Sequence, residues 1–184
     1  MNQKVEYKRK RFALARIAKE EGLLKLSGNE NMAGEAIEKY LAVFREAFNR
    51  NGNYDKYSDT RIGYRWCCAF TYYCCLQAGF TSPPKPIPEH RWTLGAVPAW
   101  YDWAILPEND FYFPANDPRK IPEAGDIILF NRLIEDVDFD HIGIVVTINE
   151  TTITTAEGNY HNQSGVFQRP LVDNINGYIR LNKF

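Results

Sequence analysis

The segment Cys67–Ala78 constrains the fold more than any other part of the sequence, because it is apolar on every side of a helix. It reads Cys-Cys-Ala-Phe-Thr-Tyr-Tyr-Cys-Cys-Leu-Gln-Ala and is followed by Gly79, a residue typical of a helix C-terminus. A helix that is hydrophobic all round belongs in the interior of a protein rather than on its surface. We therefore predict a buried helix whose first turn holds Cys67.

A cysteine in the first turn of a helix is a candidate nucleophile. The free backbone N–H groups and the positive end of the helix dipole both favour the thiolate, which is the reactive form. All four cysteines fall between Cys67 and Cys75. Residues seven or eight apart on a helix are separated by roughly 10–12 Å, too far for a disulfide or for one zinc site that holds both pairs. We expect free thiols, no metal site and no cofactor.

Candidate partners for this cysteine lie downstream. His141 begins a β-branched run that extends to Val146, and a second strand-like run from Thr151 ends on Glu157 and Asn159. The short connection between the runs predicts a hairpin, and alternation along a strand would point Glu157 and Asn159 the same way if the strand continues that far. The hairpin would bring His141 near Glu157 or Asn159. A cysteine, a base and a group that orients the base are the parts of an activated nucleophile.

Four motifs in this order resemble one family. Trp66-Cys67-Cys68-Ala69-Phe70 and the apolar residues after it look like the nucleophile helix of CHAP domains, the cysteine, histidine-dependent amidohydrolases/peptidases. These belong to the papain-like group of bacterial and phage cell-wall hydrolases. The further matching segments are residues 123–130, 140–145 and 156–159, and the resemblance covers about residues 36–181.

The resemblance implies a role for each matching residue. Cys67 matches the nucleophile, His141 the general base, Glu157 the acidic residue that orients the histidine, and Asn159 a polar residue that completes the site. Cys68 departs from the family, which usually has a small residue such as alanine there. Adjacent helical residues point about 100° apart, so only one of the two cysteines can face His141. We assign Cys67 as the nucleophile and Cys68 as a small buried residue.

The expected fold is α+β, a papain-like cysteine peptidase fold with N-terminal helices packed on an antiparallel sheet or small barrel. Residues 32–49 have apolar side chains at helical spacing and predict an amphipathic helix before the nucleophile helix. Strands are expected near residues 126–130, 141–148, 152–157, 166–169 and 177–181.

Charge divides the chain unevenly. The net charge is −1, which gives no global signature of a polyanion-binding protein, but residues 1–25 carry eight Lys and Arg against three Glu. We predict a basic N-terminal helical extension over residues 1–30 and a CHAP-like catalytic domain over residues 31–184. The cluster Lys8-Arg9-Lys10-Arg11 could meet nucleic acid, an anionic envelope polymer or a phospholipid surface, but we interpret it as a solvated helix face, and no nucleic-acid partner is expected.

No segment has the pattern of a secretory signal or of a membrane span. Charged residues interrupt the apolar stretch that follows Arg11, and no run of about 20 apolar residues occurs. We expect a monomer without a membrane span. It would act at the cell wall, outside the cell or in the periplasm, by a route other than a signal peptide, or else in the cytoplasm.

The segment from Thr81 to Pro122 is irregular and holds every proline except Pro170. Long connections in compact domains are usually functional, and aromatic residues on loops often line binding clefts. We hypothesise that Trp92, Trp100 and Trp103, together with Trp66, form a wall of the substrate groove. The alternative is that Trp100 and Trp103, at i,i+3 spacing, pack into the core. His90 and His161 rank below His141 as the base.

The turn-rich loop that starts at Asn51 carries alternating oxygen-bearing residues, a faint suggestion of calcium near residues 51–59. It lacks the clustered carboxylates of a strong calcium site, so we interpret it as a structural loop.

What the resemblance implies for substrate is peptidoglycan. The reaction would be cleavage of the N-acetylmuramoyl-L-alanine amide, or of a peptide bond in the stem or cross-bridge, by a Cys-His-Glu/Asn site. Two alternatives stay open: a cysteine protease, deamidase or acyltransferase that acts on a non-wall amide, and a non-catalytic cell-wall binding module.

Overall fold

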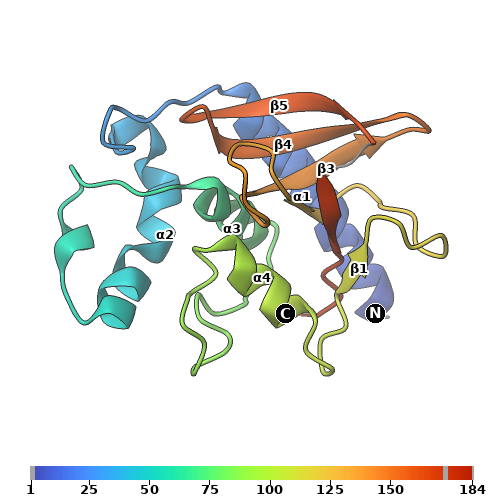
Figure 1. Ribbon diagram of the computed structural model, residues 1–184, viewed down its shortest axis with the longest axis horizontal. Helices are drawn as coiled ribbons and strands as arrows, with labels where there is room; N and C mark the ends of the chain where they lie inside the picture. Colours follow the sequence, from blue (N-terminus) through green and yellow to red (C-terminus); the bar gives the residue numbers. More distant parts are fainter. Residues whose placement is uncertain (1–2, 172–173, 184) are drawn as a thin grey trace.

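A computed structural model describes residues 3–171 and 174–183 of the chain and confirms the α+β class (Figure 1). The helices are α1 (Gln3–Leu23), α2 (Glu35–Gly52), the short 3-10 helix η1 (Lys56–Ser58), α3 (Cys67–Gln77) and α4 (Val97–Ala104). The strands are β1 (Tyr112–Pro114), β2 (Ile127–Phe130), β3 (His141–Ile148), β4 (Thr152–Tyr160), β5 (Gln163–Pro170) and β6 (Ile175–Ile179).

The strands form one six-stranded sheet in the order β1-β6-β2-β3-β4-β5, and every neighbouring pair is antiparallel. The five predicted strands are all present, and β3 and β4 form the predicted hairpin. The sequence analysis missed β1, because three residues inside a proline-rich segment show no alternation. The register of β3, β4 and β5 matters most for function, because it places the side chains described below.

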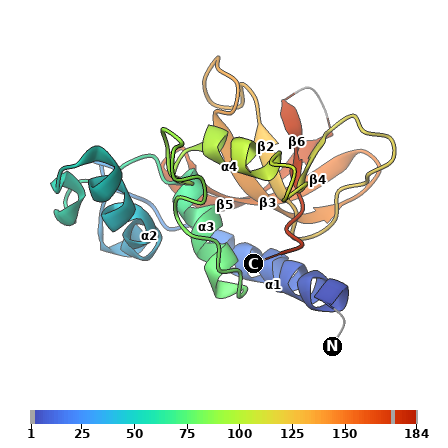
Figure 2. The same ribbon diagram turned by 90° about the horizontal axis from the view of Figure 1, so that it is seen from below.

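The helices cover one face of the sheet. Helix α3 packs on β3 and β4, α1 crosses β3, β4 and β5, and α2 packs on α3. Figure 2 shows α1 and α3 on the same side of the sheet. Gly158 of β4 allows a close approach, since a Cβ atom there would lie 2.3 Å from the Cβ of Phe70 in α3. This contact holds the start of α3 firmly against the sheet.

The hydrophobic core lies mainly between these helices and the sheet. Helix α3 is buried along most of its length, as predicted from its all-round apolar sequence. It ends at Gln77, and Gly79 has a φ of 87°, the left-handed conformation that glycine adopts readily after a helix. A smaller cluster fills the opposite face of the sheet: Phe113, Ile128, Phe130, Val145, Ile153 and Tyr178.

Helix α1 lies within the residues predicted as a basic extension. Leu14, Ala15 and Ala18 are buried, and Lys8 and Arg9 are exposed. Arg11 departs from the expected solvated face, because it is buried and donates to the carbonyl oxygen of Leu181. The division of the chain at residue 30 stays a prediction. No helix in the described part of the chain combines the length and apolarity that crossing a membrane requires.

Candidate active site

Cys67 is the first residue of α3 and is 7% exposed. Trp66 precedes it in the N-cap position and provides no side-chain cap. The first intrahelical hydrogen bond runs from the Phe70 N–H to the Trp66 carbonyl. The N–H groups of the first turn before Phe70 therefore have no partner within the helix, and the backbone N–H of Cys68 is one of the groups that lower the pKa of Cys67.

A cavity of about 400 Å³ opens over Cys67. Its walls come from segments far apart in the sequence. Three of the predicted site residues line it: Cys67, His141 and Asn159. The other lining residues are Glu30, Met32, Arg65, Ile134, Glu135, Asp140, His161 and Asn162. Glu157 lies behind His141, away from this surface.

His141 is the first residue of β3, and its side chain is fully buried. Its Nε2 lies 3.0 Å from Oε2 of Glu157. Nδ1 forms no hydrogen bond within the described part of the chain, and Cys67 lies near enough that the thiol and the imidazole shift each other's pKa. Because Glu157 occupies Nε2, Nδ1 is the nitrogen that remains for Cys67. The hydrogen-bond network thus assigns the proton of the neutral ring to Nε2.

The electrostatics of this pair favour transfer of the thiol proton to the imidazole. The largest effect on the pKa of Cys67 is a hydrogen bond from the Cys68 thiol, which lowers it. Burial raises this pKa, whereas the interaction with His141 lowers it again. The net result is a pKa well below that of an ordinary thiol. Burial lowers the pKa of His141, but its bonds to Cys67 and Glu157 outweigh this and raise the pKa to about 9. At neutral pH the arrangement stabilises a thiolate beside an imidazolium.

Glu157 is a fully buried carboxylate that accepts four hydrogen bonds. Its Oε2 accepts from His141 and from Nη2 of Arg169 at 2.8 Å, and its Oε1 accepts from Nε of Arg169 at 2.8 Å and from the Thr155 hydroxyl. Burial raises the pKa of Glu157, yet the bonds from His141 and Arg169 lower it to about 2. Gly143 on β3 leaves room for this carboxylate, since a Cβ there would lie 2.7 Å from Cγ of Glu157.

Sequence reasoning missed Arg169 and Thr155. In the antiparallel pairing of β4 and β5, Thr155 lies opposite Phe167 and Glu157 lies opposite Gly165. Alternation then puts Thr155, Glu157 and Arg169 on the same face of the sheet. The arginine at the end of the strand predicted over residues 166–169 was the available signal, but only the register shows that it meets Glu157.

Asn159 lies at the rim of the cavity rather than beside the buried pair. Its φ is 61°, and the register of β4 and β5 shifts between Glu157 and Tyr160. The regular alternation that would point Asn159 and Glu157 the same way therefore ends at Glu157. In the described part of the chain, the Asn159 side chain forms no hydrogen bond with His141 or Glu157, and its role in the site stays a prediction.

Three of the four tryptophans expected in the substrate groove are core residues. Trp66, Trp100 and Trp103 are at most 2% exposed. Trp66 stacks on Tyr40 with 5.6 Å between ring centroids, and Trp100 and Trp103 pack edge-to-face at 5.9 Å. The groove prediction is therefore wrong for these three, because buried rings cannot contact a substrate. The packing alternative is correct for Trp100 and Trp103, since one face of α4 points inward.

Trp92 is 40% exposed and lines a second hollow, which shares the lining residue Arg65 with the Cys67 cavity. Arg65 lines both hollows and forms a bidentate ion pair with Glu135, which lies on the loop between β2 and β3. This ion pair joins the segment before α3 to the loop before His141, across the mouth of the site. Trp92 thus remains a candidate for substrate contact.

The two other histidines lie apart from the buried pair. His90 bonds Asp102 at 2.8 Å within the proline-rich segment and does not line the Cys67 cavity. His161 lines the rim of that cavity, and its ring packs on Tyr160. Neither contacts Glu157.

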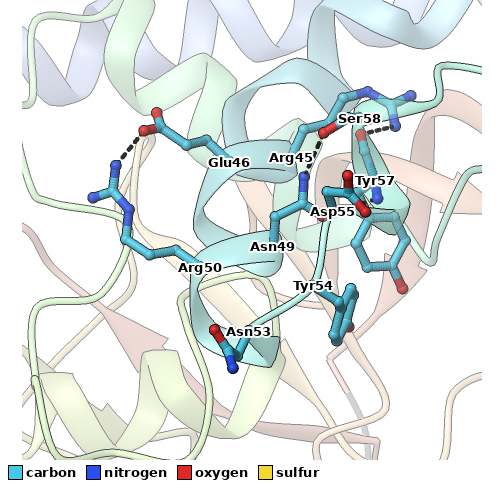
Figure 3. A pocket seen from close by; sticks show the side chains of 9 residues that line it. All are labelled: Arg45, Glu46, Asn49, Arg50, Asn53, Tyr54, Asp55, Tyr57 and Ser58. Atoms are coloured by element: carbon cyan, nitrogen blue, oxygen red, sulfur yellow. Dashed lines mark hydrogen bonds and ion pairs between the residues drawn. The ribbon is translucent and has the colours of Figure 1, made fainter.

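A surface hollow of about 710 Å³, larger than the Cys67 cavity, lies elsewhere, over the end of α2 and η1 (Figure 3). Its side chains pair with one another: Asn49 donates to Ser58, and Arg50 pairs with Glu46. Buried Arg45 binds Glu38 and backbone carbonyls of the loop, including that of Ile62. Within residues 3–171 and 174–183, no group of three His, Cys, Asp or Glu side chains is placed to hold a metal ion.

A comparison with protein families gives one match. The model of a family described as "CHAP domain" matches residues 59–159, which is more than half of the chain and includes Cys67, His141, Glu157 and Asn159. No curated protein and no solved structure matches the chain.

Proposed function

The chain belongs to the CHAP domain family, and from this premise we propose that it hydrolyses amide bonds of peptidoglycan with Cys67 as the nucleophile. Family membership supports a cysteine- and histidine-dependent amidohydrolase or peptidase, typically one related to the cell wall. The observation that carries the proposal is the buried hydrogen bond between His141 and Glu157, with Cys67 beside His141 in the lining of one open cavity.

In the proposed reaction His141 takes the proton of Cys67, and the thiolate attacks the carbonyl carbon of the scissile amide. The unpartnered N–H groups at the start of α3 stabilise the oxyanion that develops on the carbonyl oxygen. The His141 imidazolium then donates its proton to the departing amine, which leaves a thioester on Cys67. His141 next removes a proton from water, which attacks the thioester and releases the acid. Glu157 holds the ring in place and favours its charged form.

The pKa shifts predict a bell-shaped pH profile. Activity rises with pH as Cys67 loses its proton, at a pH well below the ordinary thiol value. It falls again near pH 9, because His141 then loses the proton that the leaving amine needs. Turnover measured from pH 4 to 10 checks both limbs, and a rise that continues up to pH 10 would contradict the role of His141 as general acid.

The support for peptidoglycan comes from the family and from the shape of the site. The Cys67 cavity is open and shares the lining residue Arg65 with the hollow of Trp92, which is consistent with an extended substrate that lies across both. An exposed indole suits contact with a peptide or sugar face. Replacement of Trp92 by Ala is expected to raise KM more than it lowers kcat.

The direct test is to incubate the wild-type protein and a Cys67→Ala variant with sacculi of several wall types and to identify released fragments by mass spectrometry. Fragments from the wild type alone support the proposal, and their new ends distinguish an amidase from an endopeptidase. No release from any wall type, with Cys67 still readily alkylated, would contradict peptidoglycan and favour another amide substrate. No release together with an unreactive Cys67 would favour a non-catalytic binding module.

A further inference from the structure

Arg169 is the side chain that completes the set of hydrogen bonds to the Glu157 carboxylate. A carboxylate has about four lone-pair directions, and here all four are used. Two of the four bonds come from the planar fork of Arg169, one to each oxygen at 2.8 Å. His141 and Thr155 supply the other two. The carboxylate therefore cannot rotate without breaking at least one bond to Arg169.

Arg169 is itself held in place by aromatic rings. Its guanidinium carbon lies 4.7 Å from the ring centroid of Tyr160, 5.2 Å from that of Phe167 and 5.5 Å from that of Phe130. Two of these rings also approach His141, since Phe130 and Tyr160 each lie 6.0 Å from the imidazole centroid. Phe130 and Tyr160 thus pack near both the arginine and the histidine, the two charged partners of Glu157.

The charges of the buried site balance only when Arg169 is counted. The titratable and charged groups around Glu157 are His141 from β3 and Arg169 from β5, with Cys67 and Cys68 from α3 beyond the histidine and Tyr160 from β4 beside the arginine. Arg65 and Asp140 also interact near Cys67, but they line the open cavity and lie outside this buried set. With a thiolate, an imidazolium, a carboxylate and a guanidinium, the site is neutral overall. Without the guanidinium the site carries one buried negative charge. The group of Cys67, His141 and Glu157 would then hold one more proton, and would lose it only at a higher pH than in the wild type.

We propose that Arg169 is a positioning residue for the reaction, which acts through Glu157 to orient His141 and to let Cys67 exist as a thiolate in a buried site. This inference rests on the proposed function, because it assigns the thiolate–imidazolium pair a catalytic role. It adds a fourth member, from β5, to the series of Cys67, His141 and Glu157. Its side chain does not line the Cys67 cavity, so it acts on a substrate only through the other three.

A second ion pair in the same sheet provides a matched control. Arg180, just after β6, also binds a fully buried carboxylate with two bonds, to the oxygens of Asp126 at 2.9 and 2.7 Å. It also lies over an aromatic ring, that of Phe113, at 5.2 Å. Neither Arg180 nor Asp126 lines the Cys67 cavity. Loss of Arg180 should perturb the fold much as loss of Arg169 does, without changing the charge beside His141.

The experiment compares the wild type with Arg169→Gln, Arg169→Lys and Arg180→Gln. The rate of iodoacetamide alkylation at Cys67, located by peptide mass mapping, is measured against pH, and thermal unfolding reports the fold of each variant. Arg169→Gln is expected to move the midpoint of Cys67 alkylation upward by about one pH unit, while Arg180→Gln leaves it in place. Arg169→Lys keeps the positive charge but lacks the fork. Its midpoint should stay near that of the wild type, and its turnover should fall severalfold.

Three results would overturn the proposal. The first is an unshifted midpoint in folded Arg169→Gln, and the second is an equal shift in Arg180→Gln. The third is wild-type turnover in Arg169→Lys, which also decides the matter if Arg169→Gln fails to fold. Alkylation needs no substrate, so a wild type that has a low alkylation midpoint but digests no sacculi would contradict the proposed function alone.

Discussion

Helix α3 has a Cys-Cys pair at each end, and the two pairs differ in almost everything except composition and burial. Cys67 and Cys68 open the helix, and Cys74 and Cys75 lie in its last turn. All four thiols are free and at most 7% exposed. The pKa of Cys67 nevertheless lies well below the ordinary thiol value. The pKa values of Cys74 and Cys75 are raised instead, mainly by burial.

The difference arises from the groups that each sulfur meets. Cys67 receives a hydrogen bond from Cys68 and faces His141, at the helix end where N–H groups are free. Cys74 has the nearby charge of Glu21, which raises its pKa further, and burial alone accounts for the raised pKa of Cys75. Removal from water suppresses a thiolate, and only particular donors reverse this. The end of the helix and the side on which the sulfur lies together decide which buried cysteine can react, since burial raises the pKa of Cys68, one residue further on, well above the ordinary thiol value.

Removing His141 should erase most of the contrast between the two ends. The His141→Ala variant loses the proton acceptor and the general acid, so turnover should fall by about 10²–10⁴-fold. Loss of the imidazolium should also raise the pKa of Cys67 toward that of an ordinary thiol. Alkylation of Cys67 at pH 6 measures this, with thermal unfolding as the check on the fold. Unchanged alkylation at pH 6 would argue against a thiolate–imidazolium pair.

Cys68 tests the contribution of a neighbour on the same helix. Cys68→Ala removes the thiol that donates to Cys67, so the acid limb of the pH profile should move upward by up to about one unit. Most activity at pH 8 should remain. Cys68→Ser, which keeps a donor, should restore the limb. If Cys68→Ala is inactive at every pH while Cys67→Ala retains turnover, the assignment of the nucleophile is wrong.

The smallest effect is expected at the other end of the helix. Cys75→Ala removes a buried sulfur and should lower the free energy of unfolding by about 1 kcal/mol, measured with urea. The pH profile of Cys67 alkylation should not move. A shift in that profile would mean that the two ends of α3 are coupled, contrary to the local origin argued above.

Much of this architecture could be predicted from local pattern. Residues 67–78 are apolar on all sides, which predicts a buried helix, and two β-branched runs joined by a short connection predict the hairpin of His141 and Glu157. Arg169 could not be assigned in this way, because its contact with Glu157 depends on the register of β4 and β5. The i,i+3 spacing of Trp100 and Trp103 gives them a common face but does not say whether that face points inward.

The most direct test of the central claim is alkylation of the wild-type protein with limiting iodoacetamide at pH 6, with each cysteine resolved by peptide mass mapping. Cys67 is expected to be modified first, while Cys68, Cys74 and Cys75 stay unmodified in the folded protein. Equal modification of Cys67 and Cys74, or no modification of Cys67 at pH 6, would contradict the claim that α3 presents Cys67 as a buried thiolate paired with His141.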